Sequence, residues 1–112
     1  MTQSYQAVGR PSKTAYMVVL ALAAGLYGVS AAPGALWGDS GLAQLRALRG
    51  DYVGGLGLAL AHPLFYLLAG LFQFLPFADP ALKTNLASAA CGAVTVANLY
   101  LFLRLLLPAD RA

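Results

Sequence analysis

Three apolar runs, separated by two more polar segments, set the pattern of this chain. The first, residues 14–32, holds about 19 residues without a charge. A helix of that length rises about 28 Å, close to the hydrocarbon thickness of a bilayer. The last run, residues 86–103, is of similar length and ends at Arg104. Both runs are therefore predicted to be transmembrane helices.

The middle run, residues 58–77, is interrupted by His62-Pro63. About 14 residues remain from Pro63 to Pro76, which is short for a span. Proline is well tolerated in the first turn of a helix, where its missing N–H is not needed. The sequence predicts a helix over residues 63–75 that lies at the membrane interface or is partly embedded, with a third span as the alternative.

The segment between the first two runs predicts a second interfacial helix. Pro33-Gly34 ends the first helix, and leucines then recur every three residues from Leu42 to Leu48, with polar residues between them. This spacing predicts a short amphipathic helix over residues 40–49 on the membrane surface. Further on, Asp79 and Pro80 fit the N-cap and first position of the last helix.

The predicted fold is an all-α membrane protein with two transmembrane helices. Its parts are a cytoplasmic tail (1–13), a first span (14–32), an extracytoplasmic loop with interfacial helices (33–81), a second span (82–107) and a cytoplasmic tail (108–112). Two spans leave four basic residues inside and three outside (Arg10, Lys13, Arg104 and Arg111 against Arg46, Arg49 and Lys83). The positive-inside rule thus favours a cytoplasmic N-terminus by one charge, and a third span would reverse the count.

The first run also admits a secretory signal peptide, because Ser30-Ala31-Ala32 resembles a small-residue cleavage site. Its length exceeds the hydrophobic region typical of such peptides. Small residues recur every four positions in both predicted spans (Ala24, Gly28 and Ala32; Ala89, Ala93 and Ala97). Such stripes allow close packing of helices, either with each other or with helices of another part or chain.

Composition agrees with a membrane environment. Hydrophobic residues make up 60% of the 112 residues and charged residues 10%, so polar side chains cannot cover a water-facing surface. The net charge of +3 comes from scattered basic residues without interleaved aromatics, which argues against nucleic-acid binding. A single cysteine, Cys91, excludes a disulfide within the chain and a cysteine metal site.

Asp39 is the main candidate for chemistry, since it follows the first span directly. A carboxylate at the bilayer edge could act as a general base or hold a divalent cation against a phosphate. The alternative is structural, with Asp39 as the N-cap of the helix at residues 40–49. No residue is assigned as a metal ligand, and a divalent cation is the only cofactor considered.

Four other polar residues have similar pairs of interpretations. His62 could carry a proton or mark a helix entry, and Lys83 with Asn85 could contact a lipid phosphate or anchor the helix at the interface. Asn98 lies in the middle of the last span, where a hydrogen bond to another helix is expected, with substrate contact as the alternative.

The order of short motifs along the chain resembles one family. These motifs are Ala32-Pro33-Gly34, Trp37-Gly38-Asp39-Ser40-Gly41, Ala61-His62-Pro63-Leu64, Leu71-Phe72, Leu75-Pro76-Phe77, Lys83-Thr84-Asn85-Leu86-Ala87-Ser88-Ala89 and Leu99-Tyr100-Leu101. They resemble the GT-C type of multi-spanning membrane glycosyltransferase, specifically bacterial proteins related to the transmembrane protein O-mannosyltransferase.

The resemblance implies an enzyme that takes a sugar from a polyprenyl-phosphate donor on the outer side of a bacterial inner membrane. Asp39 matches the acidic residue of the first extracytoplasmic loop at the active site. His62 matches the His-Pro element, and Lys83 and Asn85 match a basic residue and the asparagine that follows it, with roles in substrate or donor-phosphate contact. The implied partners are the bilayer, the lipid-linked donor and further transmembrane helices.

The chain departs from the family pattern at two points, where Leu42 replaces a glutamate and Leu64-Phe65-Tyr66 replaces a Pro-Gly-Tyr-Pro stretch. Enzymes of this type have many spans, and the two predicted here correspond to the first two. The expectation is a fragment of a longer enzyme or a short relative without catalysis. The alternative function is a non-enzymatic small membrane protein that packs against partner helices.

Overall fold

The computed structural model describes residues 12–55, 62–76 and 79–107, which form an all-helical fold. Its four helices are α1 (Lys13–Ser30), α2 (Gly38–Arg49), α3 (Pro63–Phe72) and α4 (Pro80–Leu106). Of the predicted tails, residues 1–11 and 108–112 lie outside the described residues. Residues 56–61, which include the start of the middle apolar run, also lie outside them.

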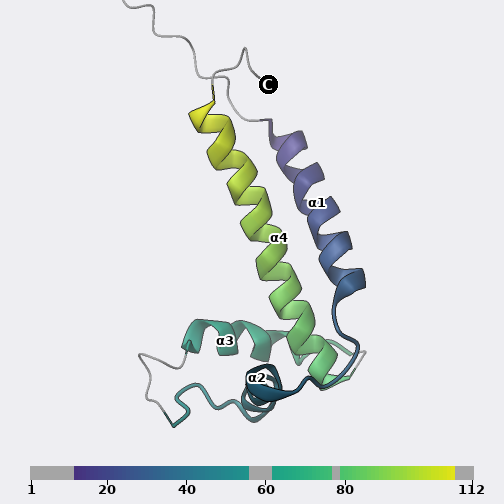
Figure 1. The fold of residues 1–112 in the computed structure, drawn as a ribbon, viewed down its shortest axis with the longest axis vertical. Helices are drawn as coiled ribbons and strands as arrows, with labels where there is room; N and C mark the ends of the chain where they lie inside the picture. Colours follow the sequence, from purple (N-terminus) through teal and green to yellow (C-terminus); the bar gives the residue numbers. More distant parts are fainter. Residues whose placement is uncertain (1–11, 56–61, 77–78, 108–112) are drawn as a thin grey trace, which may run out of the picture.

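Helices α1 and α4 run antiparallel as a long hairpin (Figure 1). Among the described residues these are the two helices long and apolar enough to cross a membrane, at 18 and 27 residues. Helix α3 is apolar but has only 10 residues, so it is too short for a third span. The two-span architecture predicted from the sequence is therefore confirmed.

Small residues form the contact between α1 and α4. Ala23 of α1 and Ala93 and Ala97 of α4 are buried. The Tyr27 ring lies so close to Gly92 that a Cβ there would come within 3.2 Å of it. Short side chains on α4 thus let the two backbones approach, as the stripe through Ala93 and Ala97 predicted.

The stripe predicted on α1 is displaced by one position. Ala24 is exposed and a Cβ on Gly28 would meet nothing, whereas Ala23 is buried. One residue is about 100° around a helix, so this shift moves the predicted stripe off the face that meets α4. The expectation for Asn98 is confirmed, because its Oδ1 accepts a hydrogen bond of 3.2 Å from the Tyr16 hydroxyl across the hairpin.

Helices α2 and α3 lie across one end of the hairpin, where α4 begins (Figure 1). Ala47 of α2, Tyr66 and Ala69 of α3 and Ala87 of α4 form a small core there, with Phe65 and Phe72 packed against it. This core joins the connecting segment between the spans to the first turns of α4. The core therefore positions the polar residues of the connecting segment.

The ends of these helices follow their capping residues. The Asp79 carboxylate accepts a hydrogen bond of 2.7 Å from the Ala81 N–H, and Pro80 and Pro63 occupy first turns, as predicted. Helix α3 ends at Phe72 rather than near Pro76. Three successive turn hydrogen bonds over residues 70–75 tighten the backbone before the proline is reached.

Candidate functional site

Asp39 lies in the first turn of α2 and is exposed. The N-cap of this helix is Trp37, whose side chain makes no capping bond, so the predicted N-cap role of Asp39 is wrong. The helix begins earlier than expected, at Gly38, which places Asp39 inside it. A carboxylate in the first turn is favoured by the helix dipole without capping a backbone N–H.

Two side-chain amides lie behind Asp39 and tie three parts of the chain together. Gln44 of α2 donates from Nε2 to Asn85 Oδ1 of α4 at 2.8 Å, and its Oε1 accepts from the Leu36 N–H at 2.9 Å. Asn85 donates from Nδ2 to the carbonyls of Ala32 at 2.7 Å and Gly34 at 3.2 Å. We call Gln44 and Asn85 the amide pair.

The amide pair fixes the segment that leaves α1. Gln44 is buried, and Asn85 is half-buried with both amide hydrogens and its oxygen engaged. A buried amide is costly unless it is bonded, so the backbone of residues 32–36 is held in one conformation. Asn85, predicted as a substrate contact, spends its hydrogen bonds on the chain itself.

A groove of about 490 Å³ opens beside the amide pair, between α1, α2 and α4. Its lining is mainly apolar and small, with hydroxyl groups from Ser30, Ser40 and Ser88. A second hollow, of about 510 Å³, is lined by Gly38 among others. Asp39 lies in the sequence between Gly38 and Ser40, one residue from the lining of each hollow, and is itself in neither lining.

Lys83 lies in the first turns of α4, half-buried. Its Nζ donates to the Gln73 carbonyl at 3.3 Å, while the Gln73 side chain bonds the Thr84 hydroxyl at 3.1 Å and the Pro80 carbonyl at 3.2 Å. These bonds attach the end of α3 to the start of α4. The ammonium group retains donors for a further acceptor.

His62 precedes α3 as its N-cap residue, which agrees with the helix-entry interpretation. Its φ of 51° is in the left-handed region, which is uncommon for a residue other than glycine. The exposed side chain lines an apolar hollow of about 340 Å³ together with Cys91. His62 therefore lies at a different hollow from the groove beside Asp39.

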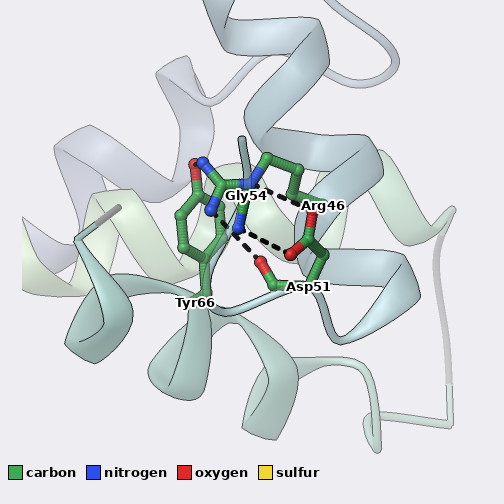
Figure 2. A network of polar contacts seen from close by, with 4 residues as sticks. All are labelled: Arg46, Asp51, Gly54 and Tyr66. Carbon is green, nitrogen blue, oxygen red and sulfur yellow. Dashed lines mark hydrogen bonds and ion pairs between the residues drawn. The ribbon is translucent and has the colours of Figure 1, made fainter. Parts of the chain in front are cut away.

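A second polar cluster stabilises the turn after α2 (Figure 2). The Arg46 guanidinium lies 4.2 Å from the centre of the Tyr66 ring and donates to the Tyr66 hydroxyl at 3.1 Å. Arg46 Nε lies 3.6 Å from Asp51 Oδ2, and Asp51 Oδ1 accepts from the Gly54 N–H at 2.8 Å. We call these four residues the Arg46 cluster.

The Arg46 cluster holds the pKa of the Asp51 carboxyl below its usual value. The Gly54 N–H contributes most to this lowering, and the positive charge of Arg46 adds to it. Gly54 is favoured by the geometry, because its φ of 59° lies in the left-handed region and a Cβ, at 2.6 Å from Nη2, would displace the end of the Arg46 side chain. The cluster thus stabilises the contact between α2 and α3.

The structure therefore separates the residues predicted from the sequence. Asn85 lines one groove with Gln44 and with Ser40, the neighbour of Asp39. Lys83 lies two residues before Asn85, about 200° around α4, and His62 lies at another hollow. Sequence reasoning missed Gln44, Arg46 and Tyr66. One signal could have found Gln44, because it follows Ala43 and precedes Ala47 by three positions, so the three residues lie on the side of the helix away from the centre of the leucine stripe.

The described residues do not make up a cation site. No group of three or more His, Cys, Asp or Glu side chains comes together within 12–55, 62–76 and 79–107. Asp39 is the only acidic residue in the first turn of α2. The described residues therefore hold no all-protein cation cage, whereas Mg²⁺ is commonly bound by one or two carboxylates together with substrate phosphates, so the prediction for Asp39 stays a prediction.

Comparison with known proteins supports the resemblance found in the motifs. Residues 57–111 match the family model of the protein O-mannosyl-transferase TMEM260 N-terminal domain. The match covers just under half of the chain and includes α3 and α4, but not α1 or Asp39. Neither a curated protein nor a solved structure matches the chain. The carboxyl-terminal half of the chain is thus similar to the N-terminal domain of the protein O-mannosyl-transferase TMEM260, and both this similarity and the two long apolar helices suggest membrane association.

Proposed function

We propose that this chain is the N-terminal segment of a GT-C-like glycosyltransferase of a bacterial inner membrane. The enzyme transfers a sugar from a polyprenyl-phosphate donor on the outer face, with the N-terminus of the chain in the cytoplasm. The observation that carries the proposal is the family match over residues 57–111. It includes His62, Lys83 and Asn85, three of the four residues proposed for the site.

The fold supports a role for the segment between the spans. This segment is packed onto the start of α4 by the core around Tyr66 and by the amide pair. Asp39 is held on a helix rather than in an irregular loop, and within the described residues no side chain bonds to it. A carboxylate that is fixed in place but unengaged is available to a substrate.

In the proposed reaction Asp39 acts as general base. The acceptor hydroxyl gives its proton to the Asp39 carboxylate, and its oxygen forms a bond to the anomeric carbon of the sugar. The bond from that carbon to the phosphate oxygen breaks, which leaves polyprenyl phosphate. Lys83 is proposed to contact the donor phosphate with its remaining donors, His62 to contact substrate, and Asn85 to support the site through the amide pair.

The test uses the protein encoded by the complete reading frame. Asp39→Asn should abolish sugar transfer in membranes supplied with a lipid-linked donor, because the amide cannot accept the proton at neutral pH. Asp51→Asn is the matched control. It removes the same charge from the same segment and keeps an oxygen for the Gly54 N–H. Full activity in Asp39→Asn would remove Asp39 from the mechanism.

A second candidate function is non-enzymatic association with other transmembrane helices. The outer face of α1 is apolar and exposed, with Leu22 at 70% and Val29 at 85%. In this alternative the hairpin binds helices of another chain through that face. Site-specific crosslinking from Leu22 would trap a protein partner, whereas crosslinks only to lipid would argue against it.

A further inference from the structure

The charges of this chain are divided unevenly between the two ends of the hairpin. At the end with α2 and α3, three basic residues are balanced by three acidic ones (Arg46, Arg49 and Lys83; Asp39, Asp51 and Asp79). The sequence at and beyond the other end carries four basic residues and one acidic residue (Arg10, Lys13, Arg104 and Arg111; Asp110). The net charge of +3 therefore comes, in the sequence, from residues at or beyond the start of α1 and the end of α4, and Lys13 and Arg104 are the ones that the structure describes.

Arg104 lies at the depth of lipid phosphates when α4 spans a bilayer. Residues 84–103 carry no charge, so Lys83 and Arg104 bracket 20 apolar or neutral positions. At about 1.5 Å per residue that stretch rises about 30 Å, the thickness of the hydrocarbon core. With Lys83 at one interface, Arg104 lies at the other.

Lys13 belongs to the same interface. The Tyr16–Asn98 hydrogen bond sets the register of the antiparallel hairpin. Lys13 is three residues before Tyr16, and Arg104 is six residues beyond Asn98, so both lie outward from this bond on the same side. Two cations therefore end the two spans at one membrane surface.

The environment of Arg104 calls for an anion. Its Nε is buried and finds no hydrogen-bond acceptor among the residues that the structure describes. Leu103 and Leu105 on either side are exposed, as expected for lipid-facing positions. A guanidinium next to lipid-facing residues extends toward the interface, where its parallel N–H donors can bind two oxygens of a phosphate.

We propose that the Lys13–Arg104 end of the hairpin binds the phosphate of an anionic phospholipid. At the opposite end the charges cancel and Arg46 is engaged within the fold, so no net attraction to anionic lipid is expected there. This lipid site is independent of sugar transfer, so its test needs no active enzyme.

The test compares phosphatidylglycerol with phosphatidylcholine. The full chain is reconstituted into bilayers with a spin-labelled form of each lipid, and the relative association constant is measured from the motionally restricted fraction. Wild-type protein should prefer phosphatidylglycerol. Arg104→Gln should lower this preference about fivefold, which corresponds to about 1 kcal/mol for one basic residue near a membrane surface.

The matched control is Arg49→Gln, which removes the same charge from the exposed last turn of α2 at the other end. It should leave the preference unchanged. If Arg104→Gln does not insert, the exposed Lys13→Gln provides the same comparison. Equal association of the two lipids with wild-type protein, or an equal loss in Arg49→Gln, would overturn the proposal.

Discussion

The side chains of Gln44 and Asn85 are hydrogen bonded at 2.8 Å although 41 residues separate them in the sequence. Each also bonds the Gly34 carbonyl, at 3.4 and 3.2 Å. One pair of amides thus connects the exit of the first span, the first interfacial helix and the entry of the second span. Since Asp39 lies five residues, about one and a half turns, before Gln44 on the same helix, its position depends on this pair.

Replacing Gln44 should destabilise the segment between the spans. Gln44→Ala leaves the Leu36 N–H without its acceptor and Asn85 Oδ1 without its donor, which costs about 1–3 kcal/mol. Thermal unfolding in detergent, followed by circular dichroism, measures the loss. Ser40→Ala is the control. Ser40 lines the same groove, and its hydroxyl makes no hydrogen bond within the described residues. Equal stability of the two variants would contradict a structural role for the amide pair.

Gly54 should not tolerate a side chain. Gly54→Ala forces a left-handed alanine and brings its Cβ against the Arg46 guanidinium, so the free energy of unfolding should fall by at least about 1 kcal/mol. Gly55→Ala adds the same methyl group to the next residue, where nothing lies within 4 Å. The two variants should differ clearly in denaturant midpoint. A Gly54→Ala protein as stable as Gly55→Ala would show that the Arg46 cluster rearranges freely.

The Arg46 cluster should weaken in acid. The pKa of Asp51 is lowered in the folded protein, so the folded state binds this proton less readily than the unfolded chain does. The stabilisation is complete above the ordinary value of 3.8 and is lost as the pH falls through the lower folded pKa. Carboxyl NMR of Asp51 should show a midpoint below 3.8, and Arg46→Gln should raise it. A midpoint that does not change in Arg46→Gln would exclude the ion pair as a cause.

The hydrogen bond between Tyr16 and Asn98 should stabilise the hairpin modestly. Tyr16→Phe removes the donor, and such bonds in membranes contribute about 0.6 kcal/mol. Unfolding by sodium dodecyl sulfate in mixed micelles measures the change. Tyr27→Phe is the control. It keeps the ring against Gly92, and it removes a hydroxyl that makes no hydrogen bond within the described residues. A larger effect in the control would mean that the hydroxyl at residue 16 does not hold the helices together.

The sequence predicted the helices well wherever a local signal was strong. The uncharged length of the first and last runs predicted two spans, and Pro63, Asp79 and Pro80 marked helix starts because their effects act on the adjacent turn. Local signals were weaker at the start of α2, which begins at Gly38 without a side-chain cap, and at the end of α3, where turns precede Pro76. The one-residue error in the small stripe of α1 shows that composition alone does not choose the contact face.

Hydrophobic length by itself predicted two helices long and apolar enough to cross a membrane, because the length of an uncharged run is a property of consecutive residues. Only the tertiary structure decided what the polar residues do. It turned Asn85 from a candidate substrate contact into half of the amide pair, and it placed His62 away from Asp39. Hydrogen bonds need partners at about 3 Å, and for Gln44, Arg46 and Asn85 those partners are supplied by the fold from distant parts of the chain.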